Sequence, residues 1–137
     1  MRYLLDTNVW IHYLKNVASP VALRLQKTPA SEVAVCSVVW AELLHGARKY
    51  ERRDDRVARV ERTLAPYQSL PFDDAAARRY AVVRDELESR GEVIGANDLL
   101  VATIALNHGL VLVTNDAAFG RVTGLHIEDW TVTNVAS

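Results

Sequence analysis

Short apolar runs that alternate with helical patterns are the feature that most constrains the fold of this 137-residue chain. The clearest run is Leu-Val-Leu-Val at 110–113, and shorter runs lie at 3–5 and 33–36. Continuous rather than alternating hydrophobicity is typical of strands that are buried on both faces. We therefore predict an α/β fold, a central parallel sheet of about four or five strands flanked by α-helices.

Capping residues mark where several of the expected helices begin and end. Ser19-Pro20 pairs an N-cap side chain with a proline at the first helical position, and Asp73 is expected to cap a long helix that Gly91 closes. Ser37 is expected to cap the helix after the second strand. We predict helices over about 7–14, 20–28, 37–50, 57–65, 74–90 and 97–108, a short helix after 115, and short strands at 68–72 and 126–127.

Length and composition are those of an ordinary globular protein, with 50% hydrophobic residues, 24% charged residues and a net charge of −1. We predict a single domain over 1–137. No apolar run approaches the roughly 20 residues of a membrane span, and the N-terminus lacks the basic start of a signal peptide. We therefore expect a cytoplasmic protein without a membrane partner, in which the single cysteine, Cys36, is a buried thiol.

Four acidic residues fall at positions that suit a binding site. Asp6 and Asp116 follow the first and the clearest strand, and Glu42 lies early in the helix that the second strand enters. Ligands of open parallel sheets bind at the carboxyl ends of the strands, so these three residues are expected at one edge of the sheet. Asp98 opens a buried helix in GANDLLVA, and only the packing of that helix could bring it to the same edge.

Each acidic residue also has a purely structural interpretation. Asp6 could cap the helix that follows it, Asp98 suits the first turn of a helix, and Asp116 could close an Asx-turn. Glu42 is harder to explain in this way, because it lies among apolar neighbours where an unpaired carboxylate is costly. If the four converge, two like charges about 4 Å apart repel by about 4 kcal/mol at an effective dielectric of about 20, unless a cation lies between them.

The residue types favour a hard divalent cation and phosphate chemistry. Oxygen ligands without a Cys or His cluster are typical of Mg²⁺ or Mn²⁺. Such an ion could polarise a phosphodiester and activate a water molecule, so that no protein nucleophile is needed. The sequence has no G-x-S-x-G elbow, P-loop or G-x-G-x-x-G motif that would indicate a different chemistry.

Several segments in register carry a family resemblance that extends from about residue 3 to residue 130. They are LLDTN, SVVWAELLHGA, GEVIGANDLLVATIAL, LVTND and GLHIEDW. Together they resemble the PIN-domain ribonucleases, and most of all the VapC toxins of bacterial toxin–antitoxin pairs. The resemblance implies a PIN-like fold with an acidic pocket that binds Mg²⁺, for which Mn²⁺ substitutes.

The resemblance also assigns roles by position. It implies that Asp6 and Asp98 are the principal metal ligands, and that Glu42 and Asp116 complete the catalytic site. The family's fourth acidic position is variable, with Asn common among VapC toxins, so Asp116 favours a fuller metal site here. Supporting roles fall to small polar residues, namely Asn8, Ser37 and Thr114.

The implied function is that of a toxin with endoribonuclease activity. It would hydrolyse RNA, often tRNA or rRNA, leave a 5′-phosphate and a 3′-hydroxyl, and restrict translation. The implied partners are a VapB-type antitoxin that silences the toxin, a second copy in a homodimer, and promoter DNA bound only through the antitoxin.

A basic stretch at 47–62 is a candidate RNA contact. Arg52, Arg56 and Arg59 would share one face of an unbroken helix and could follow a nucleic-acid backbone. A solvated helix face with local ion pairs explains the same charges equally well. Three aromatic residues are equally plausible as platforms for base stacking and as core residues, namely Trp10, Tyr13 and Trp40. For Trp40 we favour the core.

Two other function classes fit the same residues. One is a metal-dependent nuclease of DNA, since carboxylates alone do not reveal the 2′-hydroxyl of the substrate. The other is a noncatalytic module that sequesters a partner and uses its carboxylates as helix caps. The intact acids at all four positions argue against the second alternative.

Overall fold

The computed structural model describes residues 1–132, and within them it contains a five-stranded sheet in the order β3-β2-β1-β4-β5. Every neighbouring pair of strands is parallel. The strands are β1 (Tyr3–Leu5), β2 (Val33–Cys36), β3 (Gln68–Leu70), β4 (Val111–Val113) and β5 (Ile127–Glu128). The predicted α/β fold is confirmed. The single domain predicted for 1–137 extends past the described residues, because 133–137 lie outside them.

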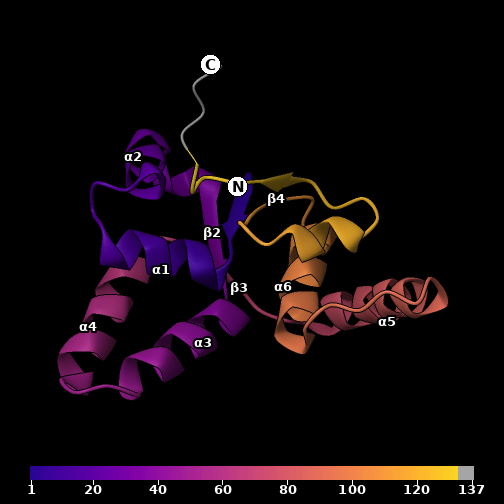
Figure 1. Ribbon diagram of the computed structural model, residues 1–137, viewed down its shortest axis with the longest axis horizontal. Coiled ribbons are helices and arrows are strands. Elements are labelled where there is room, and N and C mark those ends of the chain that lie inside the picture. Colours follow the sequence, from indigo (N-terminus) through magenta and orange to yellow (C-terminus); the bar gives the residue numbers. More distant parts are fainter. Residues whose placement is uncertain (133–137) are drawn as a thin grey trace.

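Six α-helices and two short 3-10 helices connect the strands in the described part of the chain. They are α1 (Thr7–Lys15), α2 (Pro20–Lys27), η1 (Ala30–Glu32), α3 (Ser37–Arg48), α4 (Arg53–Leu64), α5 (Asp74–Ser89), α6 (Ala96–Asn107) and η2 (Ala117–Arg121). In Figure 1 α3 and α4 lie side by side below α1, and α5 lies beside α6 at the other end of the molecule. No helix within residues 1–132 is long and apolar enough to cross a membrane.

The predicted helix starts at Ser19 and Asp73 are confirmed by side-chain caps. Ser19 Oγ accepts a hydrogen bond from the Ala22 amide at 3.2 Å, and Asp73 Oδ1 accepts one from the Ala76 amide at 2.9 Å. Gly91 follows α5 with a φ of 68°, a left-handed conformation that costs glycine little. These helices begin and end where the local sequence signals place them.

The prediction that Ser37 caps a helix is wrong. Strand β2 continues into α3 without a connecting residue, so the N-cap position falls on Cys36, whose backbone is still extended. Ser37 is the first helical residue and makes no cap, and α3 ends at Arg48 rather than near residue 50. The short helix predicted after residue 115 is present, but as the 3-10 helix η2.

Helix α6 is the most deeply buried helix, as its continuous hydrophobicity predicts. Val101, Ala102, Ile104 and Ala105 are at most 2% exposed, and the helix packs against α5, α3 and β4. Because α6 is apolar on nearly every side, its position is fixed from several directions at once. This packing determines where Asp98, in the first turn of α6, lies relative to the sheet.

Candidate active site

Asp6 lies at the carboxyl end of β1, where its side chain is buried and accepts hydrogen bonds. Its amide donates to the Val113 carbonyl at 3.0 Å, which extends the pairing of β1 with β4 by one residue. Its Oδ1 accepts from the Val9 amide at 3.2 Å and so caps α1. Burial raises the pKa of Asp6, hydrogen bonds oppose this change, and the charge of Asp116 adds to it.

Thr114 links two of the predicted site residues directly. It follows β4 and is 1% exposed. Its hydroxyl donates to Asp6 Oδ2 at 2.6 Å and accepts from the Asp116 amide at 3.1 Å. Asp116 in turn accepts from the Ala118 amide at 2.9 Å and caps η2, so the Asx-turn expected from the sequence is present as well. Asp6 and Asp116 therefore each cap a helix and also belong to the group of predicted site residues that Thr114 links.

Glu42 has a hydrogen-bond partner that the sequence patterns did not predict. Thr7 Oγ1 donates to Glu42 Oε1 at 2.7 Å, which joins the first residue of α1 to the middle of α3. The sequence contains one indication of this contact. Thr7 directly follows Asp6, so its hydroxyl lies near the edge of the sheet where Glu42 was expected. The bond orients a half-buried carboxylate.

Asp98 is the residue that reveals how close the acidic side chains are to one another. Burial raises its pKa most, and the charges of Asp6, Asp116 and Glu42 each raise it further. The four carboxylates come from separate parts of the chain, and the other three lie near enough to Asp98 to influence its pKa. We call Asp6, Glu42, Asp98 and Asp116 the carboxylate cluster.

The donor chemistry of the carboxylate cluster fits a small hard cation. Its side chains offer oxygen atoms alone, and their mutual repulsion is relieved by a positive ion. Within residues 1–132 no three His, Cys, Asp or Glu side chains are already close enough together to hold an ion. Mg²⁺ does not require such a cage, because it keeps several waters and takes one or two carboxylates.

The other two predicted supporting residues make fewer contacts than Thr114 does. Asn8 and Ser37 are exposed, and their side chains form no hydrogen bond with another residue of the described segment. Their supporting role stays a prediction. The buried thiol predicted at Cys36 is confirmed, and burial raises its pKa to about 11.

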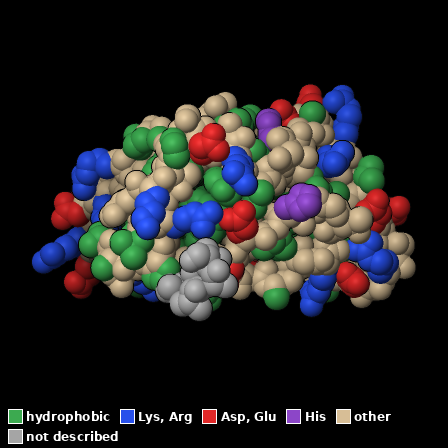
Figure 2. Space-filling view, turned by 90° about the horizontal axis from the view of Figure 1, so that it is seen from above, with side chains coloured by type: hydrophobic (Ala, Val, Ile, Leu, Met, Phe, Trp, Pro, Cys, Tyr) green, Lys and Arg blue, Asp and Glu red, His purple; other side chains and the backbone are tan. Residues whose placement is uncertain are grey.

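The three arginines proposed as an RNA contact do not share one helix face, because α4 begins after Arg52. Arg52 adopts a left-handed backbone with a φ of 59°. Arg56 donates to the Glu51 carbonyl and lies 5.2 Å from the centre of the Tyr50 ring, and Arg59 donates to the Leu14 carbonyl. Figure 2 looks at the molecule from above, on the side away from α4, and on that face basic and acidic side chains are interspersed.

The three aromatic residues considered for base stacking all pack in or against the core. Trp10 is fully buried and packs against Tyr13 and Tyr67 with ring centres 6.1 and 5.2 Å away, so it is a core residue. Tyr13 and Trp40 are partly buried and pack against the same core. The core interpretation favoured for Trp40 is confirmed.

A groove of about 470 Å³ lies between α1, α3 and α4 and reaches the carboxylate cluster at Glu42. Its lining combines apolar and basic side chains, among them Ile11, Leu14, Leu43, Val60, Arg56 and Arg59. Such a surface suits an amphipathic segment that carries acidic residues.

Comparisons with known proteins agree with this architecture. The PIN domain family matches residues 3–125. The chain is 34% identical over 131 residues to "tRNA(fMet)-specific endonuclease VapC" of Shigella flexneri and 33% identical over 131 residues to "Ribonuclease VapC2" of Haemophilus influenzae. Each alignment covers 95% of this chain and 98% of the relative.

Solved structures give the same result. A chain in the crystal structure of DNA-bound VapBC from Salmonella typhimurium superposes with a TM-score of 0.90 at 33% identity, over 95% of this chain and 98% of that one. A chain of VapBC2 from Rickettsia felis, bound to a promoter DNA fragment, gives a TM-score of 0.87 at 30% identity, over 95% and 99% of the two chains. The chain described here therefore belongs to the PIN domain family, within which it is a member of the VapC ribonucleases.

Proposed function

We propose that this protein is the toxin of a toxin–antitoxin pair and acts as a Mg²⁺-dependent endoribonuclease. It hydrolyses RNA phosphodiester bonds, leaves a 5′-phosphate and a 3′-hydroxyl, and thereby inhibits translation. The observation that carries this proposal is the hydrogen-bonded arrangement at the carboxyl edge of the sheet, where Thr114 joins Asp6 to Asp116 and Thr7 orients Glu42. The raised pKa of Asp98, to which these three carboxylates contribute, supports it. Groups that repel one another at one sheet edge need a cation to stabilise them together.

Asp6 and Asp98 would be the principal ligands of that ion, and Glu42 and Asp116 would complete its surroundings. When bound, Mg²⁺ polarises the scissile phosphodiester and lowers the pKa of a water molecule that attacks it. Mn²⁺ has similar ligand preferences and would substitute for it.

The protein's own contribution is to hold the carboxylates in place. Thr114 engages Asp6 Oδ2, and Thr7 engages Glu42 Oε1, through neutral hydroxyl donors. A neutral donor orients a carboxylate without cancelling its charge, so the full negative charge stays available to a cation. Asp6 itself is 6% exposed, so most of its side chain is shielded from solvent.

Transfer RNA is the first substrate to test. Two relatives that are 33–34% identical over 131 residues are named tRNA(fMet)-specific endonucleases. This similarity supports RNA over DNA and points to initiator tRNA. It supports a nuclease over a noncatalytic sequestering module as well.

A VapB-type antitoxin is the proposed protein partner. Solved relatives are VapBC complexes, and two of them contain DNA. We assign the antitoxin to the groove between α1, α3 and α4, whose apolar floor and arginines suit an acidic amphipathic segment. We also propose a homodimer, and promoter DNA binding through the antitoxin alone.

Cleavage of RNA by the purified, antitoxin-free protein tests the activity. Initiator tRNA and elongator methionine tRNA would be incubated with Mg²⁺ or Mn²⁺, and the product ends would be mapped. We expect discrete cuts that EDTA and Asp98→Asn both abolish. Cutting that persists in Asp98→Asn would contradict the proposed site, and cutting of DNA but not RNA would favour the DNA nuclease alternative.

A further inference from the structure

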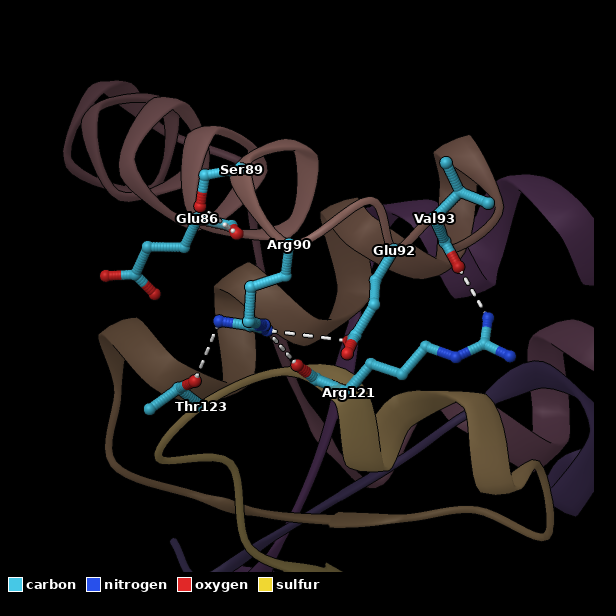
Figure 3. Close-up of polar contacts among 7 residues, drawn as sticks. All are labelled: Glu86, Ser89, Arg90, Glu92, Val93, Arg121 and Thr123. Carbon is cyan, nitrogen blue, oxygen red and sulfur yellow. Dashed lines mark hydrogen bonds and ion pairs between the residues drawn. The ribbon is translucent and has the colours of Figure 1, made fainter.

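Two arginines outside the carboxylate cluster connect two segments that are distant in the sequence. Arg121, at the end of η2, donates from Nη1 to the Val93 carbonyl at 2.6 Å. Arg90, at the end of α5, donates from Nη2 to the Arg121 carbonyl at 2.6 Å and from Nη1 to Thr123 Oγ1 at 3.4 Å. Figure 3 shows the side chains of Arg90 and Arg121 crossing between the two segments.

Each connected segment adjoins one residue of the carboxylate cluster. Residues 92–95 form no helix or strand and lead directly into α6, whose first turn carries Asp98. Helix η2 starts immediately after its N-cap, Asp116. The two arginines therefore join the approach to Asp98 with the segment that follows Asp116.

One of the two segments is firmly anchored. Phe119 in η2 is 1% exposed and belongs to the core, so η2 has a fixed position. The other segment is held less firmly, since Val93 is 73% exposed and Ile94 is only partly buried against the core. Arg121 thus extends from a buried helix to a more exposed loop, and its bond to the Val93 carbonyl limits how far that loop can move.

The first turn of α6 is the part of the helix that this connection can hold in place. Ala96 and Asn97 are exposed and Asp98 is half-buried, whereas Leu99 is 5% exposed and belongs to the core. The charge-assisted hydrogen bond from Arg121 to the loop before this turn limits how far the turn can move away from η2.

We infer that Arg121, supported by Arg90, is a positioning residue that sets the spacing between Asp98 and Asp116 and thereby the affinity of the carboxylate cluster for a divalent cation. This inference rests on the proposed function. Arg121 touches neither the cation nor the substrate and acts through the backbone of residues 92–95. Arg90 makes a further contact with the same loop through its ion pair with Glu92, at 3.6 Å.

Arg84 provides a matched control. It is an exposed arginine on α5, and it bonds to Glu88 Oε1 at 2.9 Å and to Tyr80 Oη at 3.1 Å, both on its own helix. Arg84→Ala therefore removes a similar surface contact without releasing the loop. Exposed contacts of this kind contribute little to stability, so neither variant is expected to unfold the protein.

Isothermal titration calorimetry of the RNA-free protein with Mn²⁺ tests the inference. We expect Arg121→Ala to weaken Mn²⁺ binding by about 10-fold, as is typical when a group that orients metal ligands is lost. Arg121→Lys keeps the positive charge and one donor nitrogen, so its Mn²⁺ affinity should fall less than that of Arg121→Ala. Arg84→Ala should bind Mn²⁺ as tightly as the wild type does. The melting temperature measured without metal should change by only a few degrees in each variant.

A second readout separates positioning from general damage. If Arg121 acts through the cation site, raising the Mn²⁺ concentration should restore RNA cleavage by Arg121→Ala, and Arg90→Gln should show a smaller form of the same defect. Wild-type affinity in Arg121→Ala would overturn the inference and leave the proposed function intact. Failure of the wild-type protein to bind Mn²⁺, or binding unaffected by Asp98→Asn, would overturn both.

Discussion

Thr114 and Asp6 are 108 positions apart in the sequence, and the Thr114 hydroxyl donates to Asp6 Oδ2 at 2.6 Å. Both side chains are buried, and they come from adjacent parallel strands at the carboxyl edge of the sheet. The bond therefore couples the folding of β1 against β4 to the orientation of a site carboxylate. A change at Thr114 should affect stability and activity together.

We predict that Thr114→Val destabilises the protein by about 1.5–3 kcal/mol, the typical loss for a hydrogen bond to a charged group. The substitution keeps the shape but removes the donor to Asp6 and the acceptor for the Asp116 amide. Urea unfolding would measure the change. Thr103→Val is the matched control, because the buried Thr103 hydroxyl bonds only to the neutral Leu99 carbonyl of its own helix. Equal effects of the two substitutions would contradict the prediction.

We predict that Thr7→Val lowers kcat/KM for RNA cleavage by about 10-fold and that Thr7→Ser retains most of the activity. The physical reason is the loss of the hydroxyl that orients Glu42 Oε1. Thr28→Val serves as a control, since Thr28 bonds to the Arg24 carbonyl at the end of α2. Wild-type activity in Thr7→Val would mean that Glu42 needs no orienting partner.

We predict that Asp98→Asn raises the stability of the metal-free protein at neutral pH. The pKa of Asp98 is raised in the folded state by burial and by three neighbouring carboxylates. Protonation of Asp98 therefore stabilises the fold fully below the ordinary pKa of 3.8, and this contribution is lost as the pH rises through the raised folded value. The advantage of the Asn variant should accordingly shrink as the pH falls towards 3.8.

Thermal melts across this pH range would measure the effect, with EDTA present throughout. Addition of Mg²⁺ should reverse the order, because the ion stabilises the wild-type protein and binds the variant poorly. A wild-type protein that is more stable than Asp98→Asn at neutral pH without metal would contradict the predicted repulsion.

We predict that the Cys36 thiol does not react with a disulfide reagent at pH 8 while the protein is folded. The side chain is fully buried and burial raises its pKa to about 11, so very little thiolate is present. Absorbance of the released thiol reagent would report the reaction, and one equivalent should react after unfolding in guanidinium. Rapid stoichiometric reaction of the native protein would contradict the buried position of Cys36.

The sequence by itself determined the strands, the helix limits at Ser19, Asp73 and Gly91, and the placement of Asp6 and Asp116 after parallel strands. These features depend on interactions within a few residues, namely caps, glycine conformations and the hydrophobicity of a single run. The cap predicted at Ser37 was wrong because β2 enters α3 directly, a connection that local propensity does not specify.

Only the tertiary structure decided how the remaining site residues come together. Asp98 reaches the carboxylate cluster because α6 packs against α5, α3 and β4, and Thr7 reaches Glu42 because α1 packs against α3. The bonds of Arg121 likewise depend on where η2 lies beside the end of α5. Such contacts depend on which buried faces meet, and that is set by the packing of the whole core rather than by the residues on either side of each position.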